Sequence, residues 1–107
     1  PSKANCSPEI CDWIDSYEST FGNSPNIGSA YGYMYMDITA KALEIAGRDL
    51  TTDSFLNALE SINDYKIPFG DTILSWSPEK HLGANVAYLF EVQNGAFMQI
   101  DNKEYTY

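Results

Sequence analysis

The spacing of apolar residues changes once along this chain, near residue 65, and this change limits the folds that the chain can adopt. Before that point apolar residues recur at helical intervals, which is typical of amphipathic helices. After it they alternate or form short runs, which is typical of strands. Helices followed by strands predict an α+β fold for the chain taken alone.

Helical spacing and capping residues predict three helices, over about 7–22, 29–46 and 51–62. Ser7 followed by Pro8 has the N-cap and N1 pattern of a helix start. Gly47 is suited to the position just after a helix end. Apolar residues of the second helix form two stripes, so we expect other elements to cover it on more than one side.

The second part of the chain predicts strands over about 72–76, 87–93 and 96–101. Asn94-Gly95 separates the last two strands, and this pair is the strongest short hairpin signal because a type I′ turn needs two residues with positive φ. We therefore expect Val92 to face Phe97 across the hairpin. With no internal repeat or linker, residues 1–107 are interpreted as a single domain, which the resemblance described below implies is partial.

The two cysteines flank the start of the first predicted helix. With Ser7 as N-cap, Cys6 and Cys11 occupy the N′ and N4 positions, whose side chains meet in a hydrophobic staple. A disulfide there would contribute roughly 2 kcal/mol by the chain-entropy model. Two free thiols packed as small apolar side chains are the alternative, and the sequence leaves both open.

The charge of the chain argues against several functions. Its 15 acidic and 6 basic residues give a formal charge of −9, which would repel phosphates and excludes nucleic acid as an expected partner. His81 is the only histidine, and neither cysteine has metal-ligand spacing to it, so we expect no metal and interpret His81 as a structural hydrogen-bonding residue. No nucleotide-binding or nucleophile motif occurs, so we expect no cofactor and no enzymatic activity.

No apolar run approaches the roughly 20 residues needed to span a bilayer. The chain starts at Pro1 without a basic or apolar leader segment. We therefore expect a mature form that lacks its signal peptide.

Four segments in order resemble one family of proteins: residues 30–47, 49–60, 75–83 and 87–97. The first contains Ala30-Tyr31-Gly32-Tyr33 and the last contains the Asn94-Gly95 turn. They are similar to the C-terminal third of type I periplasmic solute-binding proteins, the receptors of branched-chain amino-acid-type ABC importers. Met34 stands where relatives commonly have Asp after the Tyr-Gly-Tyr triplet, so any polar role of that Asp is not carried over.

The resemblance implies an α/β family of two lobes joined by three crossovers, with the ligand held between the lobes. This chain would supply only part of that fold, and most residues of the cleft would lie in upstream segments. The resemblance places the stretch from Ile27 to Tyr31 near the cleft and makes Ser29 and Tyr31 candidate ligand-binding residues. The alternative is that the tyrosines here simply pack around a helix start.

The resemblance further implies a periplasmic or otherwise exported receptor fragment. Its ligand would be a small amphipathic solute, such as an amino acid or an aromatic acid, and the membrane subunits of an ABC transporter would be its partners. A second hypothesis is a stand-alone assembly module derived from such a receptor. Unpaired strand edges and uncovered helix faces would then form a homodimer by segment exchange, without ligand binding.

Overall fold

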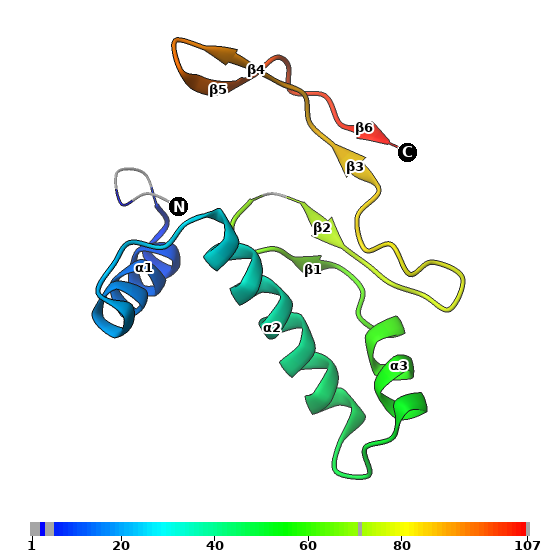
Figure 1. Ribbon diagram of the computed structural model, residues 1–107. Helices are drawn as coiled ribbons and strands as arrows, with labels where there is room; N and C mark the ends of the chain where they lie inside the picture. The colour runs from blue at the N-terminus through cyan, green and yellow to red at the C-terminus, as the bar shows by residue number, and fades with distance from the viewer. Residues whose placement is uncertain (1–2, 4–5, 71, 107) are drawn as a thin grey trace.

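The computed structural model describes residues 3, 6–70 and 72–106. Its helices precede its strands (Figure 1), as the change of period indicates. The helices are α1 (Pro8–Phe21), α2 (Ile27–Ala46) and α3 (Thr52–Glu60). The strands are β1 (Tyr65–Lys66), β2 (Ile73–Leu74), β3 (Val86–Ala87), β4 (Phe90–Gln93), β5 (Ala96–Gln99) and β6 (Tyr105–Thr106). The described part of the chain is therefore an α+β partial fold.

Local capping interactions set the ends of α1. The Ser7 hydroxyl accepts a hydrogen bond from the Ile10 amide at 3.4 Å, and Pro8 occupies the first turn, where its missing N–H is not needed. At the other end Gly22 has a φ of 70°, and its amide donates to the Glu18 carbonyl. Glycine adopts this left-handed conformation without the strain that a Cβ atom adds, so the helix ends there.

Helix α2 begins at Ile27, two residues before the predicted start at 29. The reason is Asn26, whose side chain accepts a hydrogen bond from the Ser29 amide at 3.1 Å and so acts as the N-cap. The Ser29 hydroxyl in turn accepts from the Asn26 amide at 3.4 Å. This reciprocal pair is a capping box, and it places Ser29 inside the first turn instead of at its start.

Helix α3 ends at Glu60, two residues before the predicted end at 62. The Ile62 amide donates to the Leu59 carbonyl, which is a tightened last turn, and the Ile62 carbonyl accepts from the Trp76 amide at 3.0 Å. The chain therefore leaves the helix to pair with the segment after β2.

The core lies where α2, α3, β1 and β2 meet. It consists of buried side chains from all four elements and from the segment just after α3: Met34, Ile38, Ala42, Ala58, Ile62, Tyr65 and Leu74. The two alanines, Ala42 and Ala58, belong to α2 and α3, and their small side chains allow the helices to approach closely. The buried line of α2 in this core is Met34, Ile38 and Ala42. The apolar side chains beside that line remain exposed, among them Tyr35, Met36, Leu43 and Ile45.

The strands form three separate antiparallel pairs: β1 with β2, β3 with β6, and β4 with β5. The strand predicted over 87–93 is divided, because Val86–Ala87 pairs with β6 whereas Phe90–Gln93 pairs with β5. The strand predicted over 72–76 is limited to β2, since Trp76 hydrogen-bonds to Ile62 instead of continuing the ladder. The strand predicted over 96–101 ends at Gln99. Strands β1 and β6 were not predicted, because two-residue strands carry no periodic signal.

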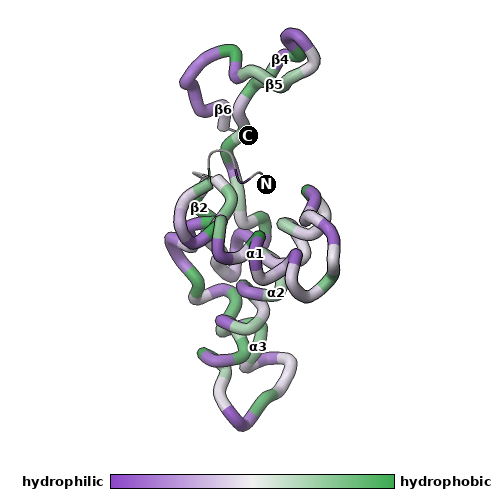
Figure 2. Tube along the Cα trace, turned by 90° about the vertical axis from the view of Figure 1, so that its left-hand side faces the viewer, coloured by the Kyte–Doolittle hydropathy of each residue, from purple (hydrophilic) through white to green (hydrophobic). Residues whose placement is uncertain are grey.

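The β4–β5 hairpin stands apart from the helices in both views (Figures 1 and 2). Asn94 and Gly95 have φ values of 52° and 79°, as a type I′ turn requires, and Val92 faces Phe97. Phe97 is 79% exposed, and Phe90 and Val92 on the same face are also exposed. The accessible surface of 7865 Å² compares with about 6,000 Å² for a compact monomer of this size. The described chain therefore leaves an unusually large surface uncovered.

Candidate functional site

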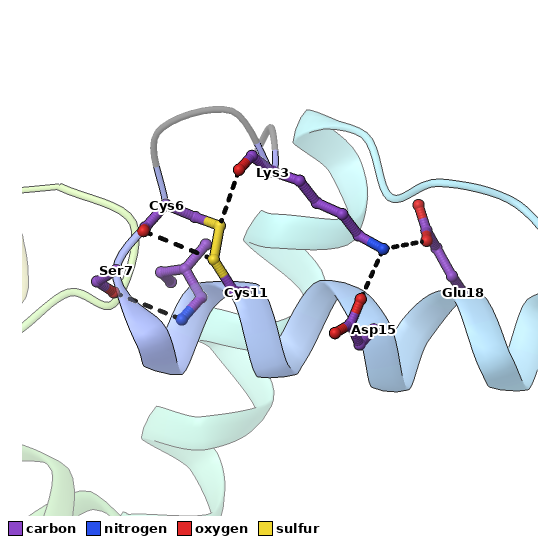
Figure 3. The surroundings of a disulfide bond; sticks show 7 residues. Lys3, Cys6, Ser7, Cys11, Asp15 and Glu18 are labelled. Carbon is purple, nitrogen blue, oxygen red and sulfur yellow. Dashed lines mark hydrogen bonds and ion pairs between the residues drawn. A yellow bond between two sulfur atoms is a disulfide. The ribbon is translucent and has the colours of Figure 1, made fainter.

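A disulfide joins Cys6 and Cys11 at the start of α1 (Figure 3), with Cα atoms 5.5 Å apart. The helix register explains the pairing, because the N′ and N4 side chains lie over the same side of the first turn. Lys3, which precedes the disulfide, reaches along α1 to Asp15 at 2.6 Å and Glu18 at 2.7 Å. The N-terminal segment is thus attached to α1 by one covalent bond and two ion pairs.

The ion pairs change the pKa values of the charged groups. Hydrogen bonds to Asp15 and Glu18 raise the pKa of the Lys3 ammonium above its usual value. Hydrogen bonds from Lys3 and Ser24 lower the pKa of the Glu18 carboxyl. These groups are exposed to water, so they contribute to the orientation of the segment and little to stability.

Aromatic side chains join α1 to the rest of the chain. The ring of Trp13 lies 5.6 Å from Tyr33 of α2 and 4.8 Å from Phe69 in the segment after β1, between centroids. Tyr33 and Phe69 are 5.8 Å apart. Three rings in mutual contact pack tightly and leave no space for a ligand between them. This cluster therefore holds α1 against α2, and Tyr33 has a packing role.

Ser29 serves the start of α2. Its hydroxyl donates to the Tyr17 hydroxyl at 3.0 Å and also takes part in the capping box with Asn26. These bonds connect the first turn of α2 to α1. The structure therefore gives Ser29 a local structural role, and a contact with ligand would have to compete with these bonds.

Tyr31 lies one turn into α2 and is 51% exposed. Its ring stacks on Tyr35, with centroids 6.2 Å apart and planes inclined by 17°. Ser29 and Tyr31 are two positions apart, so their side chains point to different sides of the helix. A single ligand could touch both only by surrounding the end of α2. Tyr31 is the more accessible candidate of the two.

A second group of polar side chains lies further along α2. The Tyr65 hydroxyl donates to the Asp37 carboxylate at 2.6 Å. The Lys41 ammonium lies 5.4 Å from the centroid of the Tyr65 ring, within the range of a cation–π interaction. The spacing of Asp37 and Lys41 indicates a shared helix face. Nothing in the sequence, however, indicates that Tyr65 lies beneath them.

Burial has a clear effect on Tyr65. Its side chain is only 6% exposed. Desolvation and the hydrogen bond to Asp37 together raise the pKa of its hydroxyl well above the usual value. Tyr65 is therefore neutral in the folded protein at physiological pH and acts as a hydrogen-bond donor.

The remaining chemistry of the described residues is structural. His81 Nε2 lies 2.9 Å from the Glu60 carboxylate and links the turn after β2 to the end of α3. Among the described residues, no cluster of His, Cys, Asp or Glu could hold a metal ion. No helix in the described ranges is long and apolar enough to cross a membrane.

A family model described as periplasmic binding protein matches residues 3–96. The crystal structure of a Rhodospirillum rubrum protein described as a branched-chain amino acid ABC transporter has a TM-score of 0.66 and 25% sequence identity. That similarity covers 92% of this chain and 28% of the Rhodospirillum protein. A comparison with curated proteins finds no match.

The family match and the structural similarity point to the same fold. Residues 3–96 include all the helices and the strands β1 to β4. This chain spans only 28% of the length of the similar Rhodospirillum protein. The chain belongs to the periplasmic binding protein family.

Proposed function

We propose that this chain is part of an extracytoplasmic receptor that captures a small amphipathic solute, such as an amino acid or an aromatic acid, for an ABC importer. The observation that carries this proposal is the family match over residues 3–96. The similar Rhodospirillum protein, whose description names branched-chain amino acids, supports the ligand class. The receptor would act in the periplasm and deliver its ligand to the membrane subunits of the transporter. It would carry out no catalysis.

The large exposed surface supports the proposal that this chain is one part of a larger receptor. The described chain exposes about 1,900 Å² more than a compact monomer of its size would. The exposed side chains include Met36 and Leu43 of α2 and Phe90, Val92 and Phe97 of the β4–β5 hairpin. Surfaces of this kind are normally covered within a larger fold. We infer that further segments of a receptor cover them and complete the ligand cleft.

Within this proposal Tyr31 is the ligand contact that the chain supplies. Its exposed ring offers apolar surface, and its hydroxyl offers a polar group to a ligand. Ser29 is proposed as a secondary contact, because its hydroxyl already bonds to Tyr17 and Asn26.

A chimera provides the test. This chain would replace the matching 28% of the Rhodospirillum protein, and L-leucine binding would be measured by calorimetry with the unmodified protein as reference. We expect the chimera to fold and bind, and Tyr31→Ala to weaken binding by roughly tenfold, as expected for a lost aromatic contact. Lys103→Ala, at an exposed site, is the matched control. A chimera that folds with intact cooperativity but binds no ligand would contradict the proposal.

A second candidate function is a ligand-free homodimer formed by segment exchange. The exposed apolar face of the β4–β5 hairpin favours it, since open strand edges pair readily with another copy. The uncovered area also exceeds the roughly 800 Å² per partner of a standard interface. Light scattering would separate the candidates: a dimer whose melting temperature rises with concentration supports this one, and a monomer eliminates it.

A further inference from the structure

A pocket of about 310 Å³ lies beside the middle of α2. It is lined by residues of α2, of the segment after α3 and of β1, among them Asp37, Lys41, Ile62, Asp64, Tyr65 and Lys66. Asp37 is six residues beyond Tyr31, or about 9 Å along the helix axis. The pocket is therefore separate from the ligand contact proposed above, and its interpretation does not depend on the receptor function.

The inner wall of the pocket is rigid and partly apolar. Ile62 and Tyr65 belong to the buried core. The hydrogen bond of 2.6 Å between Tyr65 and Asp37 fixes the ring and the carboxylate relative to each other. Asp64 has a φ of 57°, and its amide donates to the Ser75 hydroxyl at 3.0 Å, so its backbone is also held in place. A preformed wall lowers the entropy that a ligand must lose on binding.

Four of the residues that line the pocket are charged: Asp37, Asp64, Lys41 and Lys66. None of them forms an ion pair with another described residue. The chain has only 6 basic residues against 15 acidic ones, and yet the pocket gathers two of each. The pocket is thus lined by equal numbers of basic and acidic residues on an acidic protein, and the Lys41 ammonium lies over the Tyr65 ring of its inner wall.

We propose that this pocket binds a small organic zwitterion, a molecule with one ammonium and one carboxylate group. The ligand carboxylate would approach Lys41 and Lys66, and its ammonium would approach Asp37 and Asp64. A simple anion would be attracted by the two lysines but repelled by the two carboxylates. A simple cation would be attracted by the carboxylates but repelled by the lysines. Only a ligand with both charges matches the whole set. The volume is at the lower end of the range for small-molecule sites.

An NMR titration of the full 107-residue chain tests this. The probes are β-alanine, which carries both charges, propionate, which lacks the ammonium, and ethylamine, which lacks the carboxylate. We expect β-alanine to cause saturable shifts of the amides of Lys41 and Asp64–Lys66. Propionate and ethylamine should bind about fivefold more weakly, because each loses one set of exposed charge contacts.

Matched variants locate the site. Lys41→Gln and Lys66→Gln should each weaken β-alanine binding by about threefold, and Lys103→Gln should leave it unchanged. All three side chains are exposed, so the variants should keep the circular dichroism spectrum of the parent. Equal binding of propionate and β-alanine, unsaturating shifts, or pocket variants that behave like Lys103→Gln would each overturn the proposal.

Discussion

Replacing Ile62 by Ala is a direct test of the core between α2, α3 and the first strand pair. Ile62 is 5% exposed and packs in the cluster with Ile38, Ala58 and Leu74. The change removes three carbon groups at about 0.8 kcal/mol each. A cavity term raises the expected loss of unfolding free energy to about 3 kcal/mol. For a domain of this length that loss lowers the melting temperature by roughly 12–24 °C.

Ile73→Ala is the matched control, because it makes the same chemical change at a side chain that is 53% exposed. Urea unfolding followed by circular dichroism would give both free energies, and the control should lose less than about 1 kcal/mol. If Ile62→Ala leaves too little folded protein, Ile62→Val provides a milder change of about 1 kcal/mol. Equal losses at positions 62 and 73 would refute the reasoning, since the core would then contribute nothing in this chain.

Three further predictions concern other parts of the chain. The pKa of the Tyr65 hydroxyl is raised in the folded protein above its ordinary value of 10.0. The contribution of Tyr65 to stability should therefore be constant below that pH and decrease above it, as urea titrations at a series of pH values would show. Tyr65→Phe, which loses the bond to Asp37, should lower stability below that pH and reduce the alkaline fall. Reduction of the Cys6–Cys11 disulfide should destabilise the N-terminal turn of α1 by roughly 2 kcal/mol. Hydrogen exchange of the backbone amides in this turn should then become faster, and an unchanged exchange rate would contradict the prediction. Gly95→Val should abolish amide protection in β4 and β5, because a β-branched residue is strained at a φ of 79°, while protection in α2 should remain.

The sequence alone determined the features that depend on near neighbours in the chain. Ser7 and Thr51 accept hydrogen bonds from amides three residues on, so the starts of α1 and α3 follow from local chemistry. The Asn94-Gly95 turn follows from the conformational freedom of those two residues, and the turn sets the hairpin register. The order of helices and strands follows in the same way from apolar spacing.

Only the tertiary structure decided which surfaces meet. The sequence indicates two apolar stripes on α2, but the line that packs in the core, Met34, Ile38 and Ala42, matches neither stripe in full. The division of the strand predicted over 87–93 depends on β6, which is too short to show a pattern. The contact of Tyr65 with Asp37 joins residues 28 positions apart. Pairings of this kind depend on how the whole chain closes, and no local preference encodes them.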